Sequence, residues 1–207
     1  MSRPSHGFAG KRLLDLLLSA AGLVLLAPLF LGVAAWIRLD SRGPVFFRQE
    51  RIGRGGVPFR IHKFRTMRDA PGSAGPAITV GADPRITRAG AFLRRTKLDE
   101  LPQLIDVLRG DMSLVGPRPE VPQYVAGYPA EVRAKVLSVR PGLTDPASLQ
   151  FRDESALLAR AADPEREYRE VVLPAKLRLA AEYVDQATLV GDLRLIVQTL
   201  CALLGRR

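Results

Sequence analysis

The chain has 207 residues and a formal net charge of +10, from 31 lysines and arginines against 21 acidic residues. Its single cysteine, Cys201, excludes an intrachain disulfide, and only two histidines accompany it, which argues against a Cys/His zinc site. A basic excess attracts anionic lipid, nucleic acid or phosphorylated substrates. Because the apolar residues gather near the N-terminus, we expect a protein of the cytoplasmic membrane face without a nucleic-acid partner.

The segment between Asp15 and Arg38 carries no charge. A helix over residues 16–37 is long enough to cross a bilayer core of about 30 Å, and basic residues flank it on both sides. The segment is too long for a cleaved signal peptide and has no clear cleavage site. Pro28 removes a helix hydrogen bond near the middle, so we expect a kink or a break there. A kinked spanning helix and a re-entrant hairpin with both flanks in the cytoplasm fit the residues equally well.

Two alternating segments, residues 43–49 and 58–65, are separated by glycines and predict a β-hairpin with a basic face. The composition of residues 69–84, rich in Gly, Pro and Ala, predicts a mobile loop. Apolar spacing predicts helices over residues 87–97, 98–108, 129–139, 153–162, 164–187 and 191–204. Pro174 should break or kink the fifth of these. The apolar stripe of the last helix fits packing against the core better than attachment to a membrane surface.

The most suggestive polar cluster surrounds Asp99 and Glu100. At the start of a helix, both carboxylates can approach one metal or phosphate site, and nearby Arg94, Arg95 and Lys97 can hold phosphate oxygens. Carboxylates, Mg²⁺ and cationic side chains are the groups that phosphoryl transfer uses. Acidic residues also begin many helices for structural reasons alone, so spacing by itself does not establish a catalytic pair.

Four stretches of the chain resemble the bacterial sugar transferase family, the small monotopic polyprenol-phosphate phosphoglycosyl transferases. They are residues 11–15 (Lys-Arg-Leu-Leu-Asp), residues 63–67 (Lys-Phe-Arg-Thr-Met), the block 93–103 continuing through 110–119, and residues 140–144 (Arg-Pro-Gly-Leu-Thr). The match is specific because the stretches follow in order over most of the chain. Two departures stand out. The family commonly has Ser-Pro where this chain has Ala27-Pro28, and residues 145–154 differ from the Gly-Leu-Ala-Gln-Val-Asn-Gly-like stretch of many relatives, so no sugar specificity carries over.

The resemblance implies transfer of a sugar 1-phosphate from a UDP-sugar to polyprenyl phosphate, with undecaprenyl phosphate as the default lipid, and release of UMP. It implies that Asp99 is the nucleophile and forms a covalent phosphosugar–aspartyl intermediate. It assigns Glu100 to Mg²⁺ binding or to deprotonation of the lipid phosphate, and both carboxylates are candidate Mg²⁺ ligands. The expected cofactor is therefore Mg²⁺.

The resemblance also places residues around the substrates: Arg94, Arg118, Lys63 and Arg65 against phosphates, and Pro117 and Pro119 around the nucleotide. From the residues alone, Lys63 and Arg65 could simply flank the hairpin.

The expected fold class is α+β: mainly helical, with a small antiparallel hairpin and amphipathic surface helices. Residues 1–42 are predicted to form a re-entrant helix–break–helix membrane hairpin with its break at Pro28, and residues 43–207 a cytosolic, membrane-associated catalytic domain. The expected location is the cytoplasmic face of the bacterial inner membrane, in contact with lipids, and a homodimer is compatible with the sequence.

Two other classes of protein are weaker alternatives. A non-catalytic membrane scaffold should have lost the acidic pair, which is present here. A nucleic-acid-binding protein should interleave aromatic residues with its basic runs, but only 6% of the residues are aromatic.

Overall fold

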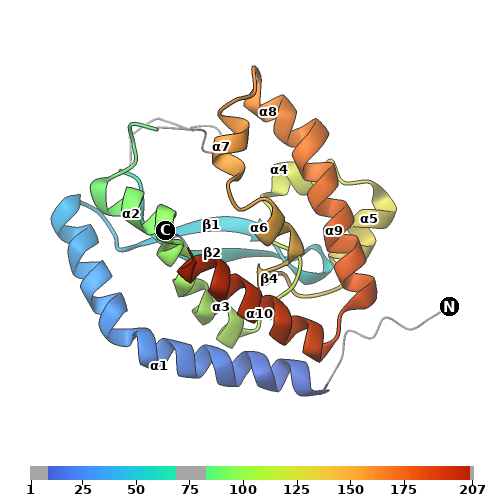
Figure 1. Ribbon diagram of the computed structural model, residues 1–207, viewed down its shortest axis with the longest axis horizontal. Helices are drawn as coiled ribbons and strands as arrows, with labels where there is room; N and C mark the ends of the chain where they lie inside the picture. The colour runs from blue at the N-terminus through green and yellow to red at the C-terminus, as the bar shows by residue number, and fades with distance from the viewer. Residues whose placement is uncertain (1–8, 69–82, 206–207) are drawn as a thin grey trace.

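The computed structural model describes residues 9–68 and 83–205, so most of the loop predicted over residues 69–84 lies outside the described residues. The described part is mainly helical and contains two small β-sheets. Figure 1 shows α1 (Ala9–Asp40) lying along two sides of the molecule, with a hairpin of two strands near the centre. The predicted α+β class with mainly helical content is confirmed.

The predicted antiparallel hairpin is formed by β1 (Phe46–Ile52) and β2 (Pro58–Phe64), joined by the short turn η1 (Arg54–Gly56). After the hairpin, the elements in chain order are α2 (Arg88–Thr96), η2 (Leu98–Gln103), α3 (Leu104–Arg109), β3 (Ser113–Val115), α4 (Pro122–Val125), α5 (Ala130–Val136), β4 (Gly142–Thr144), α6 (Pro146–Gln150), α7 (Glu154–Leu158), α8 (Pro164–Glu167), η3 (Tyr168–Val172), α9 (Leu173–Gln186) and α10 (Leu189–Leu204).

The second sheet is a pairing that the sequence patterns do not predict. Strands β3 and β4 run parallel, with Ser113 opposite Gly142 and Val115 opposite Thr144. The backbones approach so closely that a Cβ atom on Gly142 would lie 2.1 Å from the backbone nitrogen of Gly116. Only glycine fits at such a contact. The glycine of the Arg-Pro-Gly-Leu-Thr stretch therefore joins this stretch to the loop that carries Arg118.

Helix α1 is continuous through Pro28 and bends between its two halves, as Figure 1 shows. A proline inside a helix is the usual cause of such a bend. The most apolar 18-residue window within Gly10–Asp40 has a mean hydropathy of 2.4, and 11% of that window is buried in the protein. By length and composition, α1 can cross a membrane. The predicted bend at Pro28 is present without a break in the helix, and the re-entrant path stays a prediction.

Each half of α1 nevertheless packs against the rest of the chain. Leu23 and Leu26 of the first half pack against a buried cluster that includes Val107. Further along, Val33 and Ile37 are themselves buried, in a cluster with Phe64 and Leu93. The opposite side of α1 is apolar but exposed, for example Leu25 at 78% and Leu31 at 73%. One side of α1 thus belongs to the core, and the other is suited to lipid.

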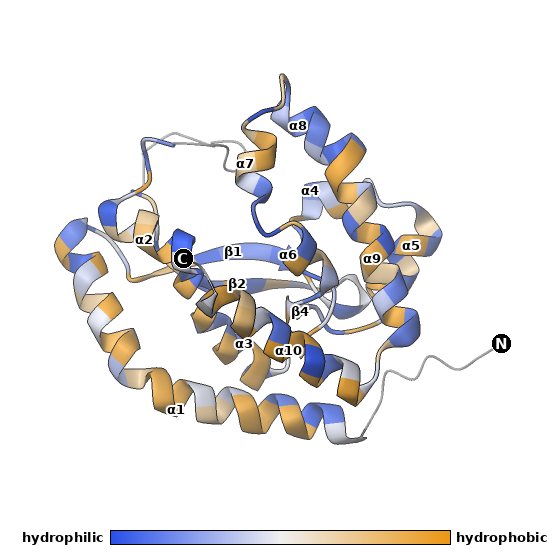
Figure 2. Cartoon of the chain, viewed as in Figure 1, coloured by the Kyte–Doolittle hydropathy of each residue, from blue (hydrophilic) through white to orange (hydrophobic). Residues whose placement is uncertain are grey.

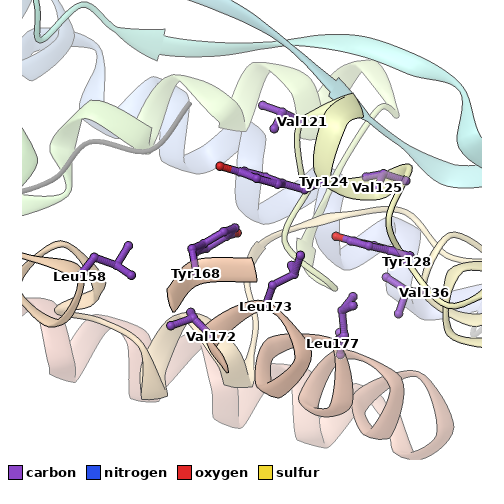
Figure 3. Close-up of a cluster of buried hydrophobic side chains, with 11 residues drawn as sticks. Val121, Tyr124, Val125, Tyr128, Val136, Leu158, Tyr168, Val172, Leu173 and Leu177 are labelled. Atoms are coloured by element: carbon purple, nitrogen blue, oxygen red, sulfur yellow. The ribbon is translucent and has the colours of Figure 1, made fainter. Parts of the chain in front are cut away.

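The remaining core lies between α4, α5, η3 and α9 and is drawn in Figure 3. Its members include Tyr124 and Tyr168, whose ring centroids lie 4.8 Å apart. The helix predicted over residues 164–187 does not break at Pro174, and a kink there stays a prediction. Helix α9 follows η3 directly, and η3 is a turn of π-helix just before Pro174. The wider π-turn accommodates a proline, which lacks the N–H that an α-helix would use.

Helix α10 has two apolar sides, visible as orange segments in Figure 2. Leu195 and Ile196 pack against the core, whereas Leu193, Val197 and Leu200 are exposed. Core packing, the favoured sequence interpretation, is therefore confirmed for one side. The other side adds to the amphipathic surface that the sequence predicts.

Candidate active site

The acidic pair lies in a tight turn between α2 and α3. Thr87 begins α2 by accepting a hydrogen bond from the Gly90 N–H, and Lys97 ends the helix in a left-handed conformation (φ 58°). The 3₁₀ turn η2 then carries Asp99 and Glu100 in its first turn. The predicted continuous helix over residues 98–108 is thus divided into η2 and α3. Because a non-glycine residue in the left-handed region is strained, the tertiary structure must hold Lys97 there.

Glu100 is fully engaged by two cations from distant parts of the chain. Lys63 of β2 places its Nζ 2.9 Å from Glu100 Oε1, and Arg118 donates through Nη1 to Oε2 at 3.0 Å and through Nη2 to Oε1. Burial would raise the pKa of Glu100, but Arg118 and then Lys63 outweigh it and hold the pKa well below its usual range. Glu100 is therefore ionised at neutral pH and orients both cations.

Asp99 is in the opposite situation. Its residue is 8% exposed, and its buried Oδ1 has no hydrogen-bond partner among the described residues. Burial, followed by the charge of Glu100, raises the pKa of Asp99 to about 6, against the opposing effects of Lys63, Lys97 and Arg94. A carboxylate that is poorly solvated and surrounded by cations is a suitable nucleophile or metal ligand near neutral pH.

The predicted phosphate-binding cations Arg94, Lys63 and Arg118 all surround this pair. Arg94 donates from Nε to Thr66 Oγ1 at 2.8 Å, and burial lowers its pKa. The pKa of Lys63 is lowered as well, again chiefly by burial. The charge of Glu100 raises the pKa of Arg118 above its usual value. Three cations around two carboxylates can neutralise the charge of a bound diphosphate.

Arg65 does not join this group, although it follows Lys63 closely in the sequence. It is 3% exposed and donates to the carbonyls of Ser41 at 2.7 Å and Arg42 at 2.6 Å, just beyond the end of α1. Its guanidinium satisfies backbone oxygens that follow the helix. The structure thus gives Arg65 a different place from the phosphate contact that the sequence predicts.

Pro117 and Pro119 are buried and shape the loop through their backbone oxygens. Pro117 O accepts from the Gly142 N–H at 2.9 Å, and Pro119 O accepts from Arg51 Nη1 at 3.0 Å. Between them, the Arg118 N–H donates to Asp145 Oδ2 at 3.2 Å. The two prolines line a small cavity away from the acidic pair, so they position Arg118 rather than wall the large cavity described next.

A cavity of about 630 Å³ opens beside Glu100, and Asp99 is not among the residues that line it. Lys97, Glu100 and Arg118 line its polar end. Its apolar side is formed by α1 and α10, through Leu18, Leu25, Leu26, Ile196, Leu200 and Leu203. Figure 2 shows these two helices as largely hydrophobic ribbons on the same side of the molecule. A cavity with these two surroundings suits a substrate with an anionic head and an apolar chain.

The third side of the cavity comes from residues that the sequence analysis did not assign to the site. Ser148 of α6 and Arg152 line it, followed by Glu154 of α7 and Lys176 of α9. Asp145 begins α6, where its Oδ1 accepts from the Ser148 N–H at 2.7 Å. The Asp-Pro pair at the start of α6 is a readable helix-start signal. The second sequence feature that could have pointed to these residues is the departure of residues 145–154 from the family pattern.

The fit of Mg²⁺ can be judged from the acidic oxygens. Mg²⁺ is commonly held by one or two carboxylates together with substrate phosphates and water. Asp99 Oδ1 is available for such a role, whereas both oxygens of Glu100 already accept hydrogen bonds from cations. The described residues contain no cluster of three or more potential ligands. The site therefore fits one protein carboxylate, Asp99, completed by the phosphates of a substrate.

Comparison with known proteins agrees with these features. Residues 6–206 match the bacterial sugar transferase family. A UDP-glucose:undecaprenyl-phosphate glucose-1-phosphate transferase of Caulobacter vibrioides is 39% identical, over 94% of this chain and 69% of its own length. The exopolysaccharide production protein PSS of Rhizobium leguminosarum bv. phaseoli is 40% identical, over 95% of this chain and 96% of its own length.

A third relative shows a different sugar in its name. The UDP-N-acetylgalactosamine-undecaprenyl-phosphate N-acetylgalactosaminephosphotransferase of Aeromonas hydrophila is 42% identical, over 68% of this chain and 34% of its own length. The resemblance seen in the motifs is confirmed by the match over almost all of the sequence. The chain belongs to the bacterial sugar transferase family.

Proposed function

We propose that this protein transfers a sugar 1-phosphate from a UDP-sugar to a polyprenyl phosphate, with undecaprenyl phosphate as the lipid acceptor and UMP as the second product. This would be the first membrane step of a glycoconjugate assembly. The relatives named above support the reaction class, and their different sugars leave the donor open. The observation that carries the proposal is the buried Asp99, with an unengaged Oδ1 beside an ionised Glu100 and three cations.

In the first step, an oxygen of Asp99 attacks the β-phosphorus of the donor. The new bond joins the Asp99 oxygen to the β-phosphorus. The bond between the β-phosphorus and the bridging oxygen breaks, and UMP leaves with the bridging oxygen. Lys63, Arg94 and Arg118 neutralise charge on the phosphates as it shifts to the leaving group. Glu100 fixes the positions of Lys63 and Arg118 through the hydrogen bonds described above.

In the second step, a phosphate oxygen of the acceptor attacks the same phosphorus. The Asp99–phosphorus bond breaks, Asp99 regains its carboxylate, and the product is a polyprenyl diphosphate sugar. Two steps allow one site to use a soluble and a lipid substrate in turn. Asp99 and the substrate phosphates would hold Mg²⁺, which would supply further neutralisation of phosphate charge.

Helix α1 supports a membrane location for this chemistry. Its exposed apolar side is long enough to lie in the bilayer, and the polar end of the large cavity lies beside it. We place the site at the cytoplasmic face of the inner membrane, where UDP-sugars are made, with α1 as a re-entrant hairpin bent at Pro28. The homodimer stays a prediction.

The test is UMP release by detergent-solubilised protein with undecaprenyl phosphate, Mg²⁺ and a panel of UDP-sugars. We expect release with one sugar and none with Asp99→Asn, which should remain folded. Intact-protein mass spectrometry without acceptor should show the added mass of a sugar phosphate on the wild type alone. Full activity of Asp99→Asn would exclude the nucleophile assignment, and no UMP from any donor would contradict the reaction.

A further inference from the structure

The third side of the large cavity, formed by residues from α6 to α9, contains a cation with unused hydrogen-bond donors. Arg152 lines this cavity, and its Nε and Nη2 are buried without a partner among the described residues. Ser148 Oγ, on the same side, is buried without a partner as well. A buried polar group left unpaired is unfavourable, and more so when it is charged. Two such groups on the lining of one cavity indicate that a ligand supplies the missing partners.

Other cations of the same cavity do not share this feature. Arg118 is bound to Glu100, and Lys176 lies 2.8 Å from Glu154. Each of these two already pairs with a carboxylate of the protein. Lys97 lines the cavity as well and has no such ion pair among the described residues, but Arg152 is the cavity cation whose buried donors lack a hydrogen bond. Arg152 is also distinct from Lys63 and Arg94, which do not line this cavity.

The apolar side of the cavity identifies the kind of anion. It is built from α1 and α10, and α1 contains the 18-residue window with a mean hydropathy of 2.4. The same helix exposes Leu25, which lines the cavity, at 78%. The apolar side is therefore continuous with the surface that faces lipid. A ligand held here has an anionic head near Arg152 and a long apolar chain along α1 and α10.

We propose that Arg152, together with Ser148, binds the phosphate of the polyprenyl phosphate acceptor, while the prenyl chain lies along α1 and α10. This assignment rests on the proposed function. It separates two phosphate positions: the donor diphosphate at Lys63, Arg94 and Arg118, and the acceptor phosphate at Arg152. Arg152 holds the acceptor for attack on the phosphorus of the aspartyl intermediate and takes no part in UMP release.

The two half-reactions separate these positions experimentally. In the first measurement, UMP formation from the UDP-sugar is followed in a single turnover without acceptor. In the second, the steady-state rate is measured against undecaprenyl phosphate concentration in detergent micelles. We would compare Arg152→Gln and Arg152→Lys with Arg160→Gln, which removes an exposed charge outside the cavity.

Arg152→Gln should leave the single-turnover UMP rate within about twofold of wild type and raise the acceptor KM at least about tenfold, a loss of roughly 1.4 kcal/mol of binding. The acceptor KM of Arg152→Lys should lie between those of wild type and Arg152→Gln, because lysine keeps the charge without the planar guanidinium. Arg160→Gln should match the wild type. The melting temperature of Arg152→Gln should not fall, since these donors have no protein partner to lose.

Two results would overturn the assignment. A slower single-turnover release of UMP would move Arg152 to the donor site, and an unchanged acceptor KM would remove it from substrate binding. Failure of the proposed function appears differently, as a wild type that forms no UMP. Native mass spectrometry of Asp99→Asn, with undecaprenyl phosphate against undecaprenol, tests the same site without turnover. Adding Arg152→Gln should abolish the preference for the phosphorylated lipid, and a retained preference would contradict the assignment.

Discussion

The charged residues at the start of α1 and those around η2 are both part of the family resemblance, yet they are used differently. At the start of α1, Lys11 donates to Val115 O at 3.0 Å and also pairs with Asp192. Arg12 donates to Val107 O at 2.7 Å, and Asp15 accepts from the Leu114 N–H at 3.0 Å. These contacts fasten α1 to β3, α3 and α10, so this charged segment holds α1 in place.

Around η2, not every buried polar atom has a hydrogen-bond partner among the described residues. Glu100 is satisfied by Lys63 and Arg118, but Asp99 keeps a buried oxygen without a partner. A buried unpaired polar atom lowers stability and persists where function requires it. Lys11 and Asp15 thus have their polar atoms bound within the protein, as structural residues do. Arg51 and Arg65 also keep one buried unpaired nitrogen each, so an unpaired atom alone does not identify a substrate site. Asp99 and Arg152 stand out because Asp99 adjoins the cavity-lining Glu100 and Arg152 lines the large cavity.

The largest predicted effect is a loss of stability when the charged contacts at the start of α1 are disrupted. Asp192→Ala removes the carboxylate that pairs with Lys11, and Asp192 is 1% exposed. Removing one partner of a buried ion pair costs about 3–5 kcal/mol, and we expect the lower end because Lys11 keeps two other oxygen partners. Thermal unfolding in detergent measures the loss. Asp185→Ala, which removes an exposed pair with Lys135, should cost no more than about 1 kcal/mol. Equal losses in the two variants would contradict the structural assignment.

A second prediction concerns the cation that compensates Glu100. Arg118→Ala removes both hydrogen bonds from the guanidinium, so the pKa of Glu100 should rise and Lys63 should lose its fixed position. We expect kcat/KM for UMP release to fall about 100-fold, equivalent to roughly 2.7 kcal/mol. Arg118→Lys keeps the charge but not the paired geometry and should fall about tenfold. If the two variants were equally active, the geometry of the pair would have no catalytic importance.

A third prediction concerns how the raised pKa of Asp99 makes the stability of the protein depend on pH. The folded-state pKa of about 6 lies above the ordinary value of 3.8, so protonated Asp99 favours folding. This stabilising effect is complete below pH 3.8 and is lost as the pH rises through about 6. Asp99→Asn cannot ionise, so its stability relative to wild type should increase by about 1.4 kcal/mol between pH 5 and pH 8. Unfolding in the presence of EDTA measures this, with exposed Asp111→Asn as the control. A pH-independent difference would show that Asp99 is not strained by ionisation.

The smallest effect concerns the turn that presents the acidic pair. Lys97 is left-handed at φ 58°, so Lys97→Gly should be about 1 kcal/mol more stable than Lys97→Ala, which keeps the strained conformation. Both variants remove the same charge, so their difference in unfolding free energy isolates the backbone. Equal stability of the two would mean that the turn relaxes when the lysine side chain is removed.

Local pattern was sufficient for several parts of the molecule. Alternation and glycines predicted the hairpin of β1 and β2, because both signals act between neighbouring residues. The uncharged run predicted α1, and Pro28 predicted its bend, since a missing N–H is a local property. Local pattern did not establish the acidic pair. The family resemblance assigned Asp99 and Glu100 to catalysis and Lys63, Arg94 and Arg118 to phosphate binding, and it did not predict that Lys63 and Arg118 bind Glu100. At Pro174 the helix does not break, but a π-turn directly before the proline interrupts the regular α-helical hydrogen bonding.

Tertiary structure decided which charged residues reach the site. Lys63 and Arg65 look alike in the sequence, but β2 ends at Phe64, so strand alternation does not place Arg65, which binds the end of α1 instead. The pairing of β3 with β4 joins segments far apart in the chain, and no periodicity reports such a contact. Whether Asp99 and Arg152 keep unpaired atoms depends on the neighbours that other elements bring to them. The sequence by itself determined the local elements and the reactive residue types, and long-range packing decided their burial, partners and surroundings.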